Sequence, residues 1–273
     1  MNKRVGIIGY GTMGAAIAER IKSVYQPVVF DKDTLKTSGA TGVRIAGSIG
    51  EAVTQSDVVI LAVKPQDFEK VLAEIKPQAA GRLIISIAAG VPTAVIEKHL
   101  DNARVVRSMP NLPARIGKGM TAVAKGKSAT AADLELALEL FRYVGTVMEV
   151  AEKMMDAITA VSGSGPGFLF HLLAGKPDDE WEFFAQHSFM PALAQAAQKV
   201  GFSAREATIL ASVTTAGSMA VVKETRLTPD ALCSQVASKG GTTEAGLHQL
   251  QGNVTNLEKA VIAARDRAKE LTK

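Results

Sequence analysis

The chain has 273 residues, with 31 Lys and Arg against 27 Asp and Glu, which gives a formal net charge of +4. Its 47% hydrophobic residues supply ample material for a buried core, and this composition excludes an intrinsically disordered chain. The basic residues are scattered, with no block of five or more, so composition gives no support to nucleic-acid binding.

The sequence carries no clear sign of export or membrane insertion. Cys233 is the only cysteine, so the chain cannot form an internal disulfide, which is typical of a reducing compartment. No apolar stretch reaches the roughly 18 residues that a membrane-spanning helix needs. Lys3 and Arg4 precede an apolar run as in a signal peptide, but that run holds three spaced glycines and continues into an amphipathic helical pattern. We therefore expect a cytoplasmic protein with neither a membrane nor a nucleic acid as partner.

The first half of the chain alternates short apolar runs with helical patterns. Strands are expected at residues 5–8, 28–30, 58–63, 83–87 and 104–107, and helices at 13–24, 66–75 and 93–99. Two further strands are expected at 121–124 and 147–150, with a helix at 134–143 between them. Thr130 and Asp133 form a start signal for that helix. Because strands that are apolar throughout are typical of burial on both faces, this half predicts a parallel sheet covered by helices.

The strand patterns stop near residue 150. Beyond that point all patterns are helical, at 152–161, 192–200, 204–224, 229–238 and 254–271. Alternating strands and helices followed by helices alone indicate two domains. We predict an α/β fold in which a Rossmann-type doubly wound sheet occupies residues 1–150 and an all-helical domain occupies residues 151–273.

A glycine-rich motif, Gly9-Tyr10-Gly11-Thr12-Met13-Gly14, follows the first expected strand and opens the first expected helix. In this context the G-x-G-x-x-G pattern indicates dinucleotide binding. Gly9 permits the tight turn, Gly11 lets the backbone approach a pyrophosphate, and Gly14 lets helix and strand pack closely. The N–H groups at the helix N-terminus then face the phosphates. A glycine-rich turn without a ligand is the alternative, and the context disfavours it.

Asp31 closes the second expected strand, where an acidic side chain can accept hydrogen bonds from the adenosine ribose. Its charge would repel a 2′-phosphate, so Asp31 favours NADH over NADPH. Lys32 and Lys36 lie close enough in sequence to offset that repulsion, and NADPH therefore stays open as the cofactor. The alternative is that Asp31 merely begins a turn.

Three loops follow strands at the edge where open α/β sheets bind ligands. They are Ala62-Val63-Lys64-Pro65, Ala88-Ala89-Gly90-Val91 and Ser108-Met109-Pro110-Asn111-Leu112-Pro113. Their small residues would let a dinucleotide lie close to the backbone, and the amide of Asn111 could hold a ligand. For each loop taken alone, ordinary turn chemistry is the simpler interpretation.

Two segments of the helical half combine glycines with hydroxyls: Ser162-Gly163-Ser164-Gly165-Pro166-Gly167 and Ser238-Lys239-Gly240-Gly241-Thr242-Thr243. Each precedes a helical pattern, so exposed N–H groups there could bind a carboxylate. Two flexible loops between helices are an equally good interpretation. The four histidines show no metal-ligand spacing and there is no G-x-S-x-G motif, so we expect neither a metal site nor a serine nucleophile.

These motifs, in this order, resemble the pyrroline-5-carboxylate reductase family over nearly the whole chain. The glycine loop is shared with many dehydrogenases and is not specific. The loops at 62–65, 88–91 and 109–111 are more specific together. The strongest matches are Val161-Ser162-Gly163-Ser164-Gly165-Pro166 and Gly240-Gly241-Thr242-Thr243.

The resemblance implies hydride transfer from NAD(P)H to the C=N carbon of Δ1-pyrroline-5-carboxylate, which gives L-proline. It also implies a cytoplasmic homo-oligomer, either a dimer formed by the helical domains or a larger ring of dimers. The active site would lie between the nicotinamide end of one subunit and helical loops that include those of a partner. Since the cofactor supplies the reactivity, the protein needs only to orient the ring and hold its carboxylate.

By the family's motif, the backbone N–H groups of Gly241, Thr242 and Thr243 would hold the carboxylate. The Thr243 hydroxyl would contact the ring nitrogen, mainly to orient it, and Thr243 is the expected catalytic residue. The expected substrate-binding residues are Ser162, Gly240, Gly241, Thr242, Thr243 and Asn111. The expected cofactor-binding residues are Gly9, Gly11, Thr12, Met13, Gly14, Asp31, Ala62, Val63, Lys64, Pro65, Ala89 and Asn111.

The chain departs from the family pattern in three places. Gly167-Phe168 stands where the family has Ala-Tyr, and Lys239 stands where proline is frequent. The family runs one continuous helix after its Ser-Gly-Pro turn, whereas Gly175 and Pro177 should break a helix here. We interpret residues 174–190 as an insertion that splits or decorates the family helix.

Two other functions remain open from the residues. One is a related reductase that takes another cyclic imine acid or a β-hydroxy acid, although the β-hydroxy acid enzymes need a lysine that residues 168–173 lack. The other is a non-catalytic dinucleotide-binding regulator. The presence of both the glycine loop and the Gly-Gly-Thr-Thr loop counts against it, because a sensor has no need of both.

Overall fold

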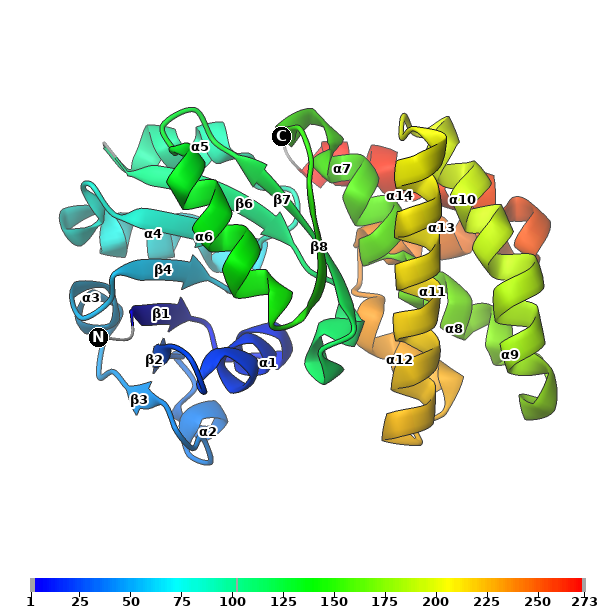
Figure 1. Ribbon diagram of the computed structural model, residues 1–273, viewed down its shortest axis with the longest axis horizontal. Coiled ribbons are helices and arrows are strands. Elements are labelled where there is room, and N and C mark those ends of the chain that lie inside the picture. Colours follow the sequence, from blue (N-terminus) through cyan, green and yellow to red (C-terminus); the bar gives the residue numbers. More distant parts are fainter. Residues whose placement is uncertain (1–2, 102, 272–273) are drawn as a thin grey trace. The chain divides into compact units, whose positions relative to one another are not determined.

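The computed structural model describes residues 3–101 and 103–271, and the chain divides into two compact units (Figure 1). The first unit comprises Met1–Met109 and Thr121–Glu152, and the second comprises Pro110–Met120 and Lys153–Lys273. Residues 110–120 therefore group with the helices, although they directly follow a strand of the sheet in the sequence.

The first unit is built on an eight-stranded sheet of order β3-β2-β1-β4-β5-β6-β7-β8. The strands are β1 (Arg4–Ile8), β2 (Gln26–Phe30), β3 (Arg44–Ile45), β4 (Val58–Leu61), β5 (Leu83–Ser86), β6 (Arg104–Met109), β7 (Gly119–Lys125) and β8 (Gly145–Glu149). The pairs from β3 to β6 are parallel, whereas β6 and β7 are antiparallel. The strand order reverses between β1 and β4, which is the switch point where sheets of this kind bind ligands.

Among the described residues of this unit, the helices that accompany the sheet are α1 (Thr12–Ile21), α2 (Thr34–Thr37), α3 (Ile49–Thr54), α4 (Pro65–Ala79), α5 (Thr93–His99) and α6 (Ala131–Arg142). All four residues of β4 and of β5 are buried, as expected for strands covered on both faces. Thr130 and Asp133 form a capping box at the start of α6, which confirms the expected start signal. The short elements α2, α3 and β3 were not predicted from the sequence.

The second unit is helical apart from its connections and the first two residues of β7. It contains η1 (Leu112–Ile116), α7 (Met155–Ile158), η3 (Thr159–Gly163), α8 (Gly165–Leu173), η4 (Asp178–Glu180), α9 (Trp181–Phe184), η5 (Ala185–Phe189), α10 (Met190–Lys199), α11 (Ala204–Thr225), α12 (Pro229–Val236), α13 (Thr242–Leu250), η6 (Val254–Asn256) and α14 (Leu257–Leu271), after η2 (Glu152–Met154) at the junction. Its core includes the fully buried Phe168, Phe170 and Phe189. None of the described helices has the length and apolar composition needed to cross a bilayer.

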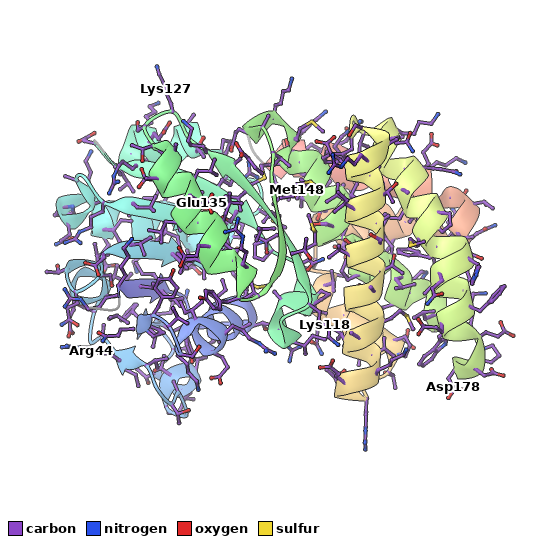
Figure 2. All side chains as sticks on the ribbon, in the orientation of Figure 1. Arg44, Lys118, Lys127, Glu135, Met148 and Asp178 are labelled. Atoms are coloured by element: carbon purple, nitrogen blue, oxygen red, sulfur yellow. The ribbon has the colours of Figure 1, made fainter. Side chains whose placement is uncertain are left out.

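The expected helix break after α8 is confirmed. Helical structure ends at Leu173 and resumes at Asp178, which lies exposed at the start of η4 (Figure 2). The indole N–H of Trp181 donates to the carbonyl oxygens of Leu173 (3.1 Å) and Lys176 (3.0 Å). Trp181 thereby supplies a donor to the last carbonyl of α8, which has no partner within the helix, and a second contact to the segment that follows it.

One expectation for the helical half is wrong. Residues 162–167 are not a loop but part of a helical run, in which the π-helix η3 leads almost directly into α8. The N–H of Ser164 donates to the carbonyl of Thr159, five residues back, at 2.8 Å. A second π-helix, η5, comes shortly before Pro191 just as η3 comes shortly before Pro166. Proline cannot donate to the carbonyl four residues back, and a wider turn accommodates the disrupted ladder.

Candidate active site

The glycine loop between β1 and α1 has the geometry of a phosphate-binding turn. Gly9 has a φ of +98°, and a Cβ there would lie 2.5 Å from the carbonyl oxygen of Ala62. A Cβ on Gly14 would collide with the carbonyl oxygen of Gly9. Gly11 is different, because it caps the N-terminus of α1 and a Cβ there would meet nothing within 4 Å. Folding therefore requires the first and third glycines, while the second leaves an open approach to the helix N-terminus for a dinucleotide.

Asp31 connects the end of β2 to that loop. Its Oδ2 accepts a hydrogen bond from the backbone N–H of Tyr10 at 2.7 Å, and its Oδ1 accepts one from Asp33 at 2.9 Å. Lys36 Nζ lies 3.3 Å from the same Oδ1. Burial alone would raise the pKa of Asp31, but these three contacts more than offset it, so the pKa lies below its ordinary value. Asp31 thus makes a local turn and also holds the glycine loop in place.

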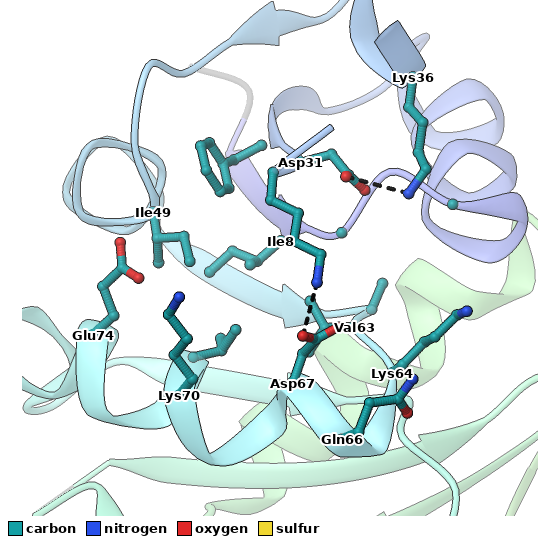
Figure 3. A pocket seen from close by; sticks show the side chains of 16 residues that line it. Ile8, Asp31, Lys36, Ile49, Val63, Lys64, Gln66, Asp67, Lys70 and Glu74 are labelled. Atoms are coloured by element: carbon teal, nitrogen blue, oxygen red, sulfur yellow. Dashed lines mark hydrogen bonds and ion pairs between the residues drawn. The ribbon is translucent and has the colours of Figure 1, made fainter. Parts of the chain in front are cut away.

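A pocket of about 600 Å³ lies beside the loop in the first unit (Figure 3). Of the expected cofactor residues, it is lined by Gly9, Gly11, Asp31, Ala62, Val63 and Lys64. Side chains of α4 also line the pocket and were not predicted from the sequence, namely Gln66, Asp67, Lys70, Val71 and Glu74. Their helical spacing directly after Lys64-Pro65 is the signal that could have found them. An ion pair of 2.8 Å joins Lys32 to Asp67 at this pocket.

The other expected cofactor residues of the first unit lie at the starts of α1 and α4 and in the loop after β5. Thr12 and Met13 form the first turn of α1, where Thr12 is exposed. Pro65 occupies the first turn of α4, where its missing N–H costs no hydrogen bond. Ala89 is half-buried in the loop after β5.

Asn111 belongs to the second unit, where its amide is fully surrounded by protein. Nδ2 donates to the carbonyl oxygen of Ser162 at 3.1 Å, and Oδ1 accepts from the N–H of Met120 at 2.8 Å. The side chain is buried, and both ends of its amide are already engaged. This arrangement gives Asn111 a structural role that the loop sequence did not indicate.

The expected Gly-Gly-Thr-Thr site forms a turn that leads into α13. The N–H of Gly240 donates to the Glu244 carboxylate at 2.7 Å, and Arg267 Nε donates to the Gly240 carbonyl at 2.9 Å. The N–H of Gly241 donates to Ser238 O at 2.9 Å. The N–H of Gly241, which the family's motif assigns to the substrate carboxylate, is therefore used within this turn. The next N–H groups, of Thr242 and Thr243, open the helix and have no acceptor within it.

A cluster of three hydroxyls lies at this helix start. Thr243 Oγ1 donates to Ser164 Oγ at 3.0 Å, and Ser164 Oγ lies 3.1 Å from Thr242 Oγ1. Thr243 and Ser164 are buried, whereas Thr242 is half-buried. Ser162, the serine named from the sequence, is buried elsewhere, and its hydroxyl has no hydrogen-bond partner within the described residues. The structure therefore brings Ser164 rather than Ser162 to the threonines.

The departure Gly167-Phe168 fits the packing around α13. A Cβ on Gly167 would lie 2.6 Å from the Cγ2 methyl of Thr243, so glycine makes room for that side chain. The ring of Phe168 lies so close to Gly246 that a Cβ there would collide with it. Gly167 on α8 and Gly246 on α13 thus allow the two helices to approach closely, and this approach sets the position of Thr243.

The described part of the chain contains neither a cluster of metal ligands nor a reactive cysteine. No group of three or more His, Cys, Asp or Glu side chains in residues 3–101 and 103–271 could hold a metal ion. Cys233 is buried, with its Sγ 3.5 Å from the carbonyl oxygen of Gly167. Burial, and then the charge of Asp230, raise the pKa of this thiol, so it stays protonated and is a poor nucleophile.

Two family models match the chain. Residues 4–90 match the model described as NADP oxidoreductase, coenzyme F420-dependent, and residues 185–271 match the model of pyrroline-5-carboxylate reductase dimerisation. The second match begins at Ala185, inside the segment 174–190 that we interpret as an insertion.

Relatives and solved structures cover the whole chain. It is 37% identical to the pyrroline-5-carboxylate reductase of Methanosarcina acetivorans, over 100% of this chain and 99% of that protein. Identity to the Synechocystis sp. enzyme is 36%, over 100% of both chains. The pyrroline-5-carboxylate reductase structure from Coxiella burnetii matches with a TM-score of 0.64 and 31% identity, over 100% of both chains. The Plasmodium falciparum pyrroline carboxylate reductase with NADP bound matches with a TM-score of 0.64 and 27% identity, over 100% of this chain and 99% of that chain. The chain therefore belongs to the pyrroline-5-carboxylate reductase family of NAD(P)H-dependent oxidoreductases.

Proposed function

We propose that this chain reduces the C=N bond of Δ1-pyrroline-5-carboxylate to give L-proline. The observation that carries the proposal is the start of α13, where the N–H groups of Thr242 and Thr243 adjoin a cluster of three hydroxyls. A helix N-terminus favours an anion, and a buried hydroxyl favours a ring nitrogen, so the two together suit a cyclic imine that carries a carboxylate.

The first unit would hold the dinucleotide. The free space at Gly11 and the pocket beside Asp31 fit a pyrophosphate and an adenosine ribose, respectively. When bound, the reduced nicotinamide supplies the hydride for the imine carbon. The protein then needs no metal or strong acid, because a protonated imine is already electrophilic.

The second unit would hold the imine acid. The N–H groups of Thr242 and Thr243 would bind its carboxylate, and the exposed Lys239 would add positive charge nearby. The Thr243 hydroxyl would contact the ring nitrogen. Because threonine is a poor acid, Thr243 would orient the ring more than it would supply a proton, and fixed orientation alone can account for much of an enzyme's acceleration.

We propose that the protein uses both cofactors, with a small preference for NADH over NADPH. The Asp31 carboxylate lines the pocket and would repel a 2′-phosphate. The ion pair with Lys36 partly neutralises that carboxylate, so NADPH should also be used. We further propose a cytoplasmic homodimer, or a ring of dimers, assembled through the helical unit. The match of residues 185–271 to the dimerisation model supports this assembly.

The test is a spectrophotometric assay with purified protein and Δ1-pyrroline-5-carboxylate at neutral pH, with NADH and NADPH oxidation followed separately. We expect rapid oxidation of both cofactors, and faster oxidation of NADH. The matched control substrate is 1-pyrroline, which lacks the carboxylate and should be reduced far more slowly. Equal rates with both imines would contradict the carboxylate site. Turnover only with a six-membered imine acid would instead identify the chain as a reductase of that analogue.

A further inference from the structure

Ser164 occupies a special position, at the point where the π-helix η3 passes into α8. We propose that Ser164 is a positioning residue that fixes the Thr243 hydroxyl for its contact with the imine nitrogen. This inference rests on the proposed function and adds a residue to which the family's motif gives no role.

The π-helix explains why Ser164 faces α13. Its N–H reaches the carbonyl of Thr159, five residues back. A π turn contains one more residue than an α turn, so the residues after it are rotated by about 100° from their α-helical register. Ser164 directly follows this turn and contacts Thr243, and such π turns occur frequently at functional sites.

The hydrogen bonds of Ser164 give its hydroxyl control over Thr243. The Ser164 side chain is fully buried, so water cannot replace it as a partner. Its Oγ accepts the Thr243 hydroxyl at 3.0 Å, and the 3.1 Å contact with Thr242 Oγ1 engages it on a second side. With two partners on α13, the serine oxygen has little freedom to move, and the Thr243 oxygen is held with it.

Packing also restricts the Thr243 side chain, in addition to its hydrogen bond with Ser164. Its Cγ2 methyl fills the space that Gly167 leaves open. A methyl confined on one side and a hydroxyl bonded on the other together select one rotamer of a β-branched side chain. Loss of the Ser164 hydroxyl would remove one of these two restraints without changing the backbone of α13.

The experiment is a double-mutant cycle on the purified full-length protein with Ser164→Ala, Thr243→Ala and the combined variant. Steady-state kinetics with Δ1-pyrroline-5-carboxylate, dinucleotide affinity by fluorescence titration and thermal unfolding are measured for each. We expect Ser164→Ala to lower kcat/KM for the imine about tenfold, with unchanged dinucleotide affinity. In the Thr243→Ala background the same change should have no further effect, because residues that act as a unit are not additive.

Two further variants keep the test decisive. Ser218→Ala removes a buried hydroxyl of the same unit that donates within α11 to the carbonyl oxygen of Thr214, and it should leave kinetics unchanged. Ser164→Cys retains a weak acceptor of similar size, so its activity should lie between those of wild type and Ser164→Ala. Wild-type kinetics in Ser164→Ala, or an equal loss with and without Thr243, would overturn the inference. An inactive wild-type protein that still binds dinucleotide would overturn the proposed function itself.

Discussion

The side-chain amide of Asn111 donates to the carbonyl oxygen of Ser162 at 3.1 Å, although the two residues are 51 positions apart. Pro166, four residues beyond Ser162, has no N–H to offer that carbonyl. Asn111 therefore supplies a donor at the point where proline interrupts the helical ladder. The same amide accepts from Met120 N–H, so one side chain joins the segment 110–120 to the π-helix that leads to Ser164.

Replacement of Asn111 by alanine should destabilise the second unit. The change removes two buried hydrogen bonds and leaves the Met120 N–H and the Ser162 carbonyl without these partners, at a cost of about 2–4 kcal/mol. Thermal unfolding followed by circular dichroism would show the lower midpoint. Asn256→Ala is the control, since the Asn256 amide makes a longer contact of 3.4 Å with Leu250 O in a partly buried place. Similar midpoints for the two variants would contradict the structural role of Asn111.

Alanine substitutions in the glycine loop should separate folding from binding. Gly11→Ala should keep the wild-type unfolding midpoint, because its Cβ would meet nothing within 4 Å. It should weaken dinucleotide binding at least tenfold, since that Cβ occupies the approach to the helix N-terminus. Gly14→Ala, in contrast, should weaken binding and also lower the unfolding midpoint, because its Cβ would collide with the Gly9 carbonyl.

The control for this pair is Gly39→Ala, at an exposed position of the first unit where a Cβ also meets nothing. It should change neither stability nor affinity. Unimpaired dinucleotide binding by Gly11→Ala, measured by fluorescence titration, would mean that the pyrophosphate does not approach this part of the loop.

Lys36→Met should strengthen discrimination against NADPH. Without its ammonium group, the Asp31 carboxylate keeps its full negative charge toward a 2′-phosphate. The effect should be modest, a few-fold in the ratio of kcat/KM values, because Lys36 is exposed and water screens the pair. Lys76→Met, which removes an exposed lysine paired with Asp101 outside the pocket, is the matched control. A fall in the preference for NADH would show that Asp31 does not govern cofactor choice.

Much of the first unit can be predicted from the sequence because its strands are buried on both faces. β4 is apolar throughout and β5 is apolar except for Ser86, and that pattern has few interpretations other than a covered parallel sheet. The glycine spacing likewise follows from steric requirements at Gly9 and Gly14 that hold for any chain with this turn. The short α2 and β3 lack such a pattern, since they contain four and two residues.

The candidate site is less predictable because it depends on contacts between distant segments. Gly-Gly-Thr-Thr identifies the start of α13, but the pairing of Thr243 with Ser164 spans 79 positions. It also depends on a π-helical turn, whose extra residue leaves no periodic signal in a short segment. For the same reason the sequence points to Ser162, two residues away from the serine that contacts the threonines.

Trp181→Phe should destabilise the region around α8. The phenyl ring preserves most of the apolar contact, but the indole N–H that caps Leu173 and Lys176 is lost. Loss of a helix cap of this kind costs about 1–2 kcal/mol. Urea unfolding monitored by far-ultraviolet circular dichroism measures the difference, and Phe183→Leu, at an aromatic residue that is 67% exposed, is the control. Equal stability of the two variants would show that the indole bonds contribute nothing.

Asp133→Asn should make stability depend less on pH. The Asp133 carboxylate accepts hydrogen bonds from the N–H (2.8 Å) and hydroxyl (2.7 Å) of Thr130 and from Arg104 (2.6 Å). Burial raises its pKa, but the contacts with Thr130 and Arg104 outweigh burial, so its pKa in the folded protein lies below the ordinary value. The ionised form is therefore favoured by folding. Its contribution is fully present above the pKa of the unfolded chain, near 4, and is lost as the pH falls through the lower folded value.

Urea midpoints at pH 7 and at pH 3 would test this dependence. At pH 7 the variant should be about 1–2 kcal/mol less stable than wild type, because a neutral amide cannot replace the carboxylate toward both Thr130 and Arg104. At pH 3 the difference in stability should narrow, because the unfolded wild-type chain then binds a proton at Asp133 that folding must displace. Glu135→Gln provides the control, because its pair with Arg142 is exposed on both sides and contributes little at either pH. A gap for Asp133→Asn that stays constant between the two pH values would show that the capping box, rather than the carboxylate charge, stabilises the start of α6.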